Sequence, residues 1–88
     1  MKIKIEKFIP TGKGNRILGY ANVNFADAVT VRGIRLIQGH NGIFMAMPQE
    51  QGADQKWYDK IRIIDEPTRL KLQAMMIKAY EKELSHED

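Results

Sequence analysis

Four residues close to position 60 have the types and the spacing expected of a nucleic-acid contact. Lys56, Tyr58, Lys60 and Arg62 occupy alternate positions, which share one face if the segment is a β-strand. With a rise of roughly 3.3 Å per residue, the cations stand about 7 Å apart, close to the reach between neighbouring phosphates of an extended strand. The ring of Tyr58, between them, can stack on a base. A solvated strand face shows the same pattern, and the spacing alone favours that simpler interpretation.

Other cations extend this predicted surface. Lys13 and Arg16 lie at the tip of the first expected hairpin, and Arg69 and Lys71 lie in the first turns of an expected helix. A helix dipole opposes a cation near the helix N-terminus. A phosphate or a carboxylate is therefore the natural partner of Arg69.

The chain lacks the residue patterns of an enzyme or a metal site. It has no cysteine, which removes disulfides, thiolate ligands and cysteine nucleophiles. His40 lies in an expected turn and His86 near the C-terminus, and neither has a spacing partner for a metal site or a triad. The pair Asp65-Glu66 is better explained as a helix cap than as catalytic acids. The sequence predicts a non-enzyme without metal or cofactor.

The length and the charge of the chain limit the number of domains and the kind of partner that we expect. The 88 residues make one domain, 1–88, whose modest core makes self-association a common route to stability. The N-terminus alternates Lys and Ile without a long apolar run, which predicts neither a signal peptide nor a membrane span. Residues 1–35 carry seven Lys and Arg against two acids, and residues 36–88 carry seven against nine. A basic front with an acidic tail suits a polyanionic partner.

Alternation of apolar and polar residues predicts strands in the first two thirds of the chain. Ile3 and Ile9 share one face of the first strand, and Phe8 is the exception. In the third strand Arg32 and Arg35 fall on opposite faces, so at least one needs a partner or an edge position, because a lone buried charge is costly. Short turns favour antiparallel pairing. The expected strands are a first one ending at Ile9, then Ile17–Phe25, Ala28–Ile37, Ile43–Met47 and Lys56–Ile64, with a turn at Asn41-Gly42, Pro48 ending the fourth strand, and a polar loop at Gln49–Gln55.

The last third of the chain has a helical pattern. Asp65 or Glu66 can cap a helix that holds Pro67 in its first turn, and Thr68 to about Leu84 are good helix formers. The apolar positions form two neighbouring stripes on the helix. Together they span an arc that is too wide for one packing surface to cover. Either the helix lies deep against its own sheet, or one stripe packs on the sheet and the other on a second subunit. The stripes are Leu72, Met76, Ala79 and Tyr80, and Leu70, Ala74, Ile77 and Leu84.

A series of short motifs runs along nearly the whole chain. In order they are Ala21-Asn22-Val23-Asn24-Phe25 with Asp27, Val31-Arg32-Gly33-Ile34-Arg35-Leu36-Ile37, Gly39, Asn41-Gly42, Phe44, Ala46-Met47-Pro48, Trp57, Asp59, Thr68-Arg69, Lys71, Leu72 and Tyr80. In these motifs the chain resembles the stage V sporulation protein G family, bacterial regulators linked to septation and sporulation. The run from Ile34 to Pro48 is the most specific part.

The resemblance implies a small α+β fold, an antiparallel sheet of about five strands followed by a C-terminal helix, that associates as a dimer through its sheet. It also implies sequence-preferring binding to DNA, and in some members RNA. After Ala-Met-Pro, family members typically carry a serine and a basic pair, whereas this chain has Gln49, Glu50 and Gln51. Their loss removes phosphate contacts and lowers the expected affinity. Where the family often has histidine–proline, this chain has Arg62-Ile63, which suggests that charge has moved from the loop to the fifth strand.

We therefore expect a cytoplasmic homodimer, without a membrane partner, that binds DNA or RNA in the regulation of sporulation and septation. The alternative is a protein-interaction module that acts in division or regulation without binding nucleic acid. The expected phosphate contacts are Lys56, Arg62, Arg69 and Lys71, and the expected stacking residue is Tyr58.

Overall fold

Six strands are followed by one helix in the part of the chain that the structure describes. The structure is a computed structural model, and it describes residues 1–12 and 14–85. The predictions about Lys13 and His86 lie outside this range. The elements are β1 (Ile3–Pro10), β2 (Ile17–Phe25), β3 (Val29–Gly39), β4 (Gly42–Ala46), β5 (Gln49–Gln51), β6 (Trp57–Asp59) and α1 (Glu66–Ser85).

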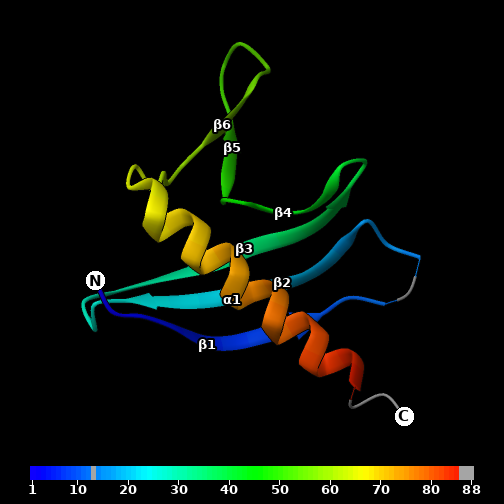
Figure 1. Cartoon of the computed structure of the whole chain (residues 1–88). Coiled ribbons are helices and arrows are strands. Elements are labelled where there is room, and N and C mark those ends of the chain that lie inside the picture. Colours follow the sequence, from blue (N-terminus) through cyan, green and yellow to red (C-terminus); the bar gives the residue numbers. More distant parts are fainter. Residues whose placement is uncertain (13, 86–88) are drawn as a thin grey trace.

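The first four strands form an antiparallel sheet in the order β1-β2-β3-β4. Figure 1 shows α1 crossing one face of this sheet, while β5 and β6 project from the end of β4 as a separate ribbon. The α+β class and the C-terminal helix are therefore confirmed. The first four predicted strands are also confirmed, with ends that differ by a residue or two.

The prediction of a fifth strand over Lys56–Ile64 is wrong. Only Trp57–Asp59 is a strand, and it pairs with Gln49–Gln51, which was expected to be loop. The backbone N–H of Lys60 still donates to the carbonyl of Pro48 at 2.8 Å. Proline has no N–H to return, so the ladder stops there. The ribbon is therefore two three-residue strands, and the residues from Lys60 to the helix have no regular structure.

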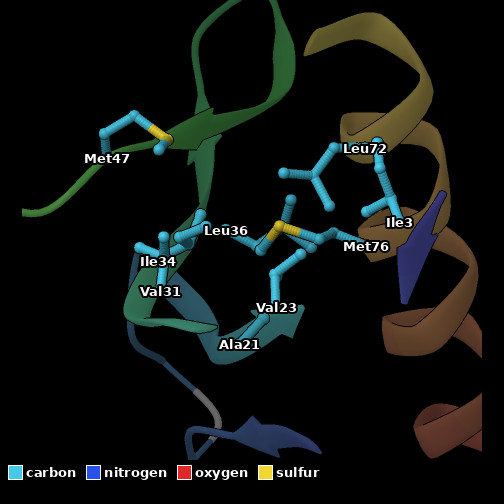
Figure 2. Close-up of a cluster of buried hydrophobic side chains, with 9 residues drawn as sticks. All are labelled: Ile3, Ala21, Val23, Val31, Ile34, Leu36, Met47, Leu72 and Met76. Carbon is cyan, nitrogen blue, oxygen red and sulfur yellow. The ribbon is translucent and has the colours of Figure 1, made fainter. Parts of the chain in front are cut away.

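The core lies between the sheet and the helix. Figure 2 shows Leu72 and Met76 reaching from α1 toward the sheet, where Met76 approaches Leu36 and Val23. The side chains of Leu72 and Met76 are fully buried, and burying one such side chain is worth about 1.5–3 kcal/mol. The predicted first stripe of the helix is thus confirmed as the core stripe. The nine buried apolar residues are Ile3, Ala21, Val23, Val31, Ile34, Leu36, Met47, Leu72 and Met76.

A β-bulge in β1 explains the exception at Phe8. Ile5 pairs with Val23 and Lys7 with Asn22, so Glu6 is an extra residue in the ladder. An extra residue reverses which alternate positions face the core. Phe8 consequently packs against the core, whereas Ile9 is 44% exposed on the other face. The prediction that Ile9 shares the face of Ile3 is wrong for this reason.

A second bulge, in β3, puts Arg32 and Arg35 on the same face of the sheet. Ala21 pairs with Ile34 and Val23 with Val31, so two residues of β3 stand opposite Asn22. One of them, Gly33, has φ +80°, a conformation that glycine adopts without a steric penalty. Val31 and Ile34 both face the core, which leaves Arg32 and Arg35 together on the opposite face. The prediction that these arginines lie on opposite faces is therefore wrong.

The helix begins as predicted, at an aspartate cap. The carboxylate of Asp65 accepts a hydrogen bond from the backbone N–H of Thr68 at 3.0 Å and another from the Thr68 hydroxyl. Pro67 lies in the first turn, where its missing N–H has no intrahelical partner to lose. In the second predicted stripe, Ile77 is partly buried against the core, whereas Leu70, Ala74 and Leu84 are exposed. Within the described residues this chain does not cover them, so the helix does not lie deep against its own sheet on both stripes.

Two leucines of α1 provide a matched test of this packing. Leu72→Ala removes side-chain atoms from a fully buried site and should lower the free energy of unfolding by about 2–5 kcal/mol. Leu70 is 50% exposed on the same helix, so Leu70→Ala should lower it by about 0.5 kcal/mol or less. Urea denaturation followed by circular dichroism measures both. Equal losses would contradict the orientation of the helix.

Candidate nucleic-acid interface

The sheet has one face that α1 does not cover. The helix packs on the face that carries the core residues, and alternation places the remaining strand residues on the other. Strand pairing divides this outer face into a basic half, near the start of β3, and an apolar half, near the β3–β4 turn.

The basic half carries four cations from two strands. Lys4 and Lys7 come from β1, and Arg32 and Arg35 come from β3. Lys4 and Lys7 pair with Asn24 and Asn22 of the intervening strand, so the outward side chains between the two pairs of cations are neutral amides. Phosphate groups are the natural ligands of such a surface.

In the described part of the sheet, one carboxylate lies among these cations, that of Glu6, and it already accepts hydrogen bonds. Glu6, the bulge residue, accepts hydrogen bonds from the side chains of Asn24 and Thr30, each at 3.2 Å. Both donors are neutral, so Glu6 reduces the positive potential near Lys4 without forming an ion pair within the described residues. The half as a whole remains positive.

A groove lies beside the basic half, where the ribbon leaves the sheet. β4 ends opposite Arg35, so the first part of β3 has no strand beside it on that side. The groove there is open and measures about 530 Å³, and its lining residues are Arg32, Gly33, Arg35, Pro48, Gln49 and Trp57. The guanidinium of Arg35 donates from Nη2 to the carbonyl of Met47 at 3.4 Å, which ties it to the groove wall. The site therefore combines two cations and an indole ring.

The apolar half forms the other end of the outer face. Ile9 pairs with Tyr20, and Ile37 pairs with both Ile17 and Phe44. Cross-strand pairs of this kind stand side by side on one face of a sheet. Ile9, Tyr20 and Phe44 are among the exposed large apolar residues. These pairs make up the apolar half, and Arg35 borders it because Arg35 pairs with Tyr20.

Tyr58, the predicted stacking residue, closes the loop of the ribbon. Its hydroxyl donates to the carboxylate of Asp54 at 2.5 Å, and its ring lies so close to Gly52 that a Cβ there would approach it to 2.9 Å. The hydrogen bond from Tyr58 lowers the pKa of Asp54, and the same bond raises the pKa of Tyr58. Register places Tyr58 opposite Glu50, on the ribbon face away from Trp57.

The predicted phosphate contacts do not converge on one surface. Lys56 is exposed at the start of β6, and Arg62 lines an apolar cleft beside Thr68. Arg69 forms an ion pair with Glu66 at 2.6 Å, which is the carboxylate partner that its position requires, and this bond raises the pKa of Arg69. Lys71 lies on another side of the helix, beside Lys78. The structure thus brings none of the four into the groove.

Arg32, Arg35 and Trp57 were not among the predicted site residues. A glycine flanked by strand residues, as in Val31-Arg32-Gly33-Ile34-Arg35, is a signal for a bulge. Recognising it would have placed both arginines on one face. The approach of Trp57 has no such local signal, because it depends on where the ribbon folds back.

Two other kinds of feature are absent from residues 1–12 and 14–85. No group of three or more His, Cys, Asp or Glu side chains in this range is placed to hold a metal ion. No helix in it has the length and apolar character needed to cross a membrane.

Comparison with known proteins identifies related chains. A family model described as SpoVG matches residues 1–82. A protein of Bdellovibrio bacteriovorus named "Putative septation protein SpoVG" is 31% identical over 96% of this chain and 77% of its own length. A protein of the same name from Clostridium beijerinckii is 33% identical over 97% of this chain and 90% of its own. "Putative septation protein SpoVG 2" of Listeria monocytogenes is 34% identical over 76% of this chain and 66% of its own.

The hydrogen bond between Tyr58 and Asp54 predicts a pH effect. It favours the ionised carboxylate, so it stabilises the loop at neutral pH and is lost as the pH falls through the lowered pKa of Asp54. Tyr58→Phe should return the pKa of Asp54 toward its ordinary value, as measured by NMR titration of the carboxyl carbon. Tyr20→Phe, on the sheet, is the control and should leave it unchanged. An unchanged pKa of Asp54 in Tyr58→Phe would contradict this hydrogen bond. The ring of Tyr58 would then be free for the predicted stacking.

Proposed function

The chain belongs to the SpoVG family, and from this premise we propose that it is a regulatory nucleic-acid-binding protein of bacteria that acts in septation and sporulation. The septation role is taken from the names of its relatives. In this proposal the protein binds as a homodimer in the cytoplasm and catalyses no reaction. Its partners are DNA or RNA and a second copy of itself.

The basic half of the outer sheet face is the observation that carries this proposal. Four cations meet there with one carboxylate among the described strand residues, although the whole chain has a formal charge of only +3. A sheet holds such charges at fixed spacing, so a polyanion that spans them releases several counterions at once. The predicted contacts Lys56, Arg62, Arg69 and Lys71 remain candidates for additional phosphates outside this half.

The apolar half of the same face supports the homodimer. It contains the pair Ile9–Tyr20 and the pair Phe44–Ile37, in which Phe44 and Ile9 are 43% and 44% exposed. The sheet edges are less suited to pairing with another chain. Edge strand β1 is interrupted by the bulge at Glu6, and on edge strand β4 the N–H of Met45 donates to the side chain of Gln73 at 3.2 Å. Two copies can therefore meet face to face over the apolar halves and leave both basic halves open.

A second candidate function is docking of a protein partner in division or regulation. The exposed stripe of α1 favours it, because Leu70 and Leu84 are 50% and 46% exposed and Ala74 lies between them. Apolar residues at helical spacing are the usual contacts of helix-mediated recognition. In this function binding would not depend on the basic half.

The nucleic-acid proposal predicts a salt effect confined to one surface. Lys4→Ala with Lys7→Ala should weaken binding to DNA and RNA and reduce the slope of log K against log salt by roughly 1.4 to 1.8, since each phosphate contributes about 0.7 to 0.9. Fluorescence anisotropy at several salt concentrations measures the slope.

Two further double variants serve as matched comparisons, because each also removes two positive charges. Lys78→Ala with Lys82→Ala alters exposed residues of α1 and should leave the slope unchanged. Lys56→Ala with Arg62→Ala tests the contacts predicted from the sequence, and a reduced slope would add them to the interface. Equal small changes in all three variants would contradict a localised surface.

The dimer proposal predicts that a charge in the apolar half separates the subunits. Phe44→Glu should raise the dissociation constant of the dimer at least about tenfold, because aromatic residues at the centre of an interface commonly contribute 2 kcal/mol or more. Sedimentation velocity measures it. Ile64 is 83% exposed but lies outside the sheet, so Ile64→Glu is the control. A wild-type chain that sediments as a monomer at high concentration would overturn the proposal.

A further inference from the structure

We propose that the groove between β3 and the ribbon binds one unpaired nucleotide of a single-stranded nucleic acid, with its base stacked on Trp57 and its phosphate held by Arg32 and Arg35. This rests on the proposed function and adds to it the form of nucleic acid that is bound. Neither the family match nor the names of the relatives assign a ligand to these three residues.

Trp57 is placed as a stacking platform. Its side chain is 62% exposed, although tryptophan is on average highly buried in folded proteins. It belongs to the lining of the groove, on the ribbon face that also carries Gln49 and Asp59. The loop of the ribbon is closed from the other face, by Tyr58 and Asp54. The indole ring is therefore free for a ligand, and base–aromatic stacking tolerates any base sequence.

The two arginines supply the anion-binding part of the groove. Arg35 is oriented by the carbonyl of Met47, which occupies one of its five N–H donors. Arg32 is exposed and has no ion pair with another described residue. A guanidinium matches the geometry of a phosphate group and binds it through two parallel hydrogen bonds.

The carboxylate nearest to the groove along the ribbon is that of Asp59. It accepts a hydrogen bond from the side-chain amide of Gln49 at 2.8 Å. Among the described residues, those that line the groove include no acid. The charged residues that line the groove are therefore the two arginines, which suit a phosphate, although the Asp59 carboxylate beside Gln49 reduces the positive potential.

The combination of ring and cations selects a single strand over a duplex. In a duplex both faces of each base are stacked on neighbours, so an aromatic side chain cannot reach them unless the base is extruded. An unpaired base has a free face. The groove, at about 530 Å³, falls within the range of roughly 300–1,000 Å³ of small-molecule pockets, which suits one nucleotide. The strand can continue from Arg32 over the basic half toward Lys7.

Intrinsic fluorescence reports on this site directly, because Trp57 is the only tryptophan in the chain. A twelve-nucleotide single-stranded DNA of mixed sequence should quench the emission of Trp57, and the same sequence as a duplex should quench it less. Anisotropy with labelled single strand should show roughly 5- to 150-fold weaker binding for Trp57→Ala, the range expected for loss of one stacked base. Trp57→Phe keeps an aromatic ring and should recover most of the loss.

A second variant separates charge from stacking. Arg32→Gln with Arg35→Gln should reduce the salt slope for the single strand by about 0.7, since the one phosphate that the two arginines hold contributes about 0.7. Trp57→Ala should leave that slope unchanged while it lowers affinity. Circular dichroism checks that each variant is folded.

Different experimental outcomes would contradict the nucleotide groove and the proposed function. If the wild type binds single strand and duplex equally and Trp57→Ala changes neither affinity, the groove is not the site, although nucleic-acid binding stands. If uridine monophosphate quenches Trp57 at the same concentration as the oligonucleotide, the ligand is a free nucleotide and the assignment to a strand is overturned. If the wild type binds no nucleic acid at low salt, both proposals fail.

Discussion

The packing of Leu72 and Met76 against one face of the four-stranded sheet is the interaction on which the rest of the structure depends. A chain of 88 residues buries only nine apolar side chains in the described core, and two of the fully buried ones come from the helix. A single helix of 20 residues can cover one side of such a sheet and no more. Within the described residues, no other element covers the opposite side.

The pairing of the sheet has three register shifts, and those at Glu6 and Gly33 place the cations of that open side. Without the extra residue at Glu6, Phe8 would turn outward and Ile9 inward. Without Gly33, one of Arg32 and Arg35 would face the core, where a charge is costly. Each bulge shifts the alternation by one residue. Together they place cations at one end of the outer face and apolar residues at the other, which are the surfaces that we propose for binding and for self-association.

The ribbon of β5 and β6 contributes residues to the groove beside this face. Gln49 to Gln51 stand where the family resemblance leads one to expect a basic pair, and they form β5 instead of a charged loop. Their partner strand carries Trp57 to the side of the arginines. A ring next to two guanidinium groups offers stacking and phosphate contacts at once, which the lost basic pair could not do. The replacement therefore removes charge from the ribbon and leaves Trp57 with the two arginines as the proposed contact.

Much of the fold could be predicted from the sequence, because local rules determine it: alternation marked the first four strands, and Asp65 with Pro67 marked the start of the helix. The family was also identifiable from its motifs. The site was not predictable in the same way. Alternation was followed across Glu6 and Gly33 as if the ladder were regular, and it was continued beyond Asp59, where Pro48 has no N–H to extend the pairing. Whether Arg32, Arg35 and Trp57 share a groove depends on contacts between β3 and Trp57 of the ribbon, which lies more than twenty residues later in the chain. The sequence determined the elements, because propensity, capping and turn formation act between neighbours. Only the tertiary structure decided which side chains meet, because register and the return of the ribbon are set by pairing between distant strands.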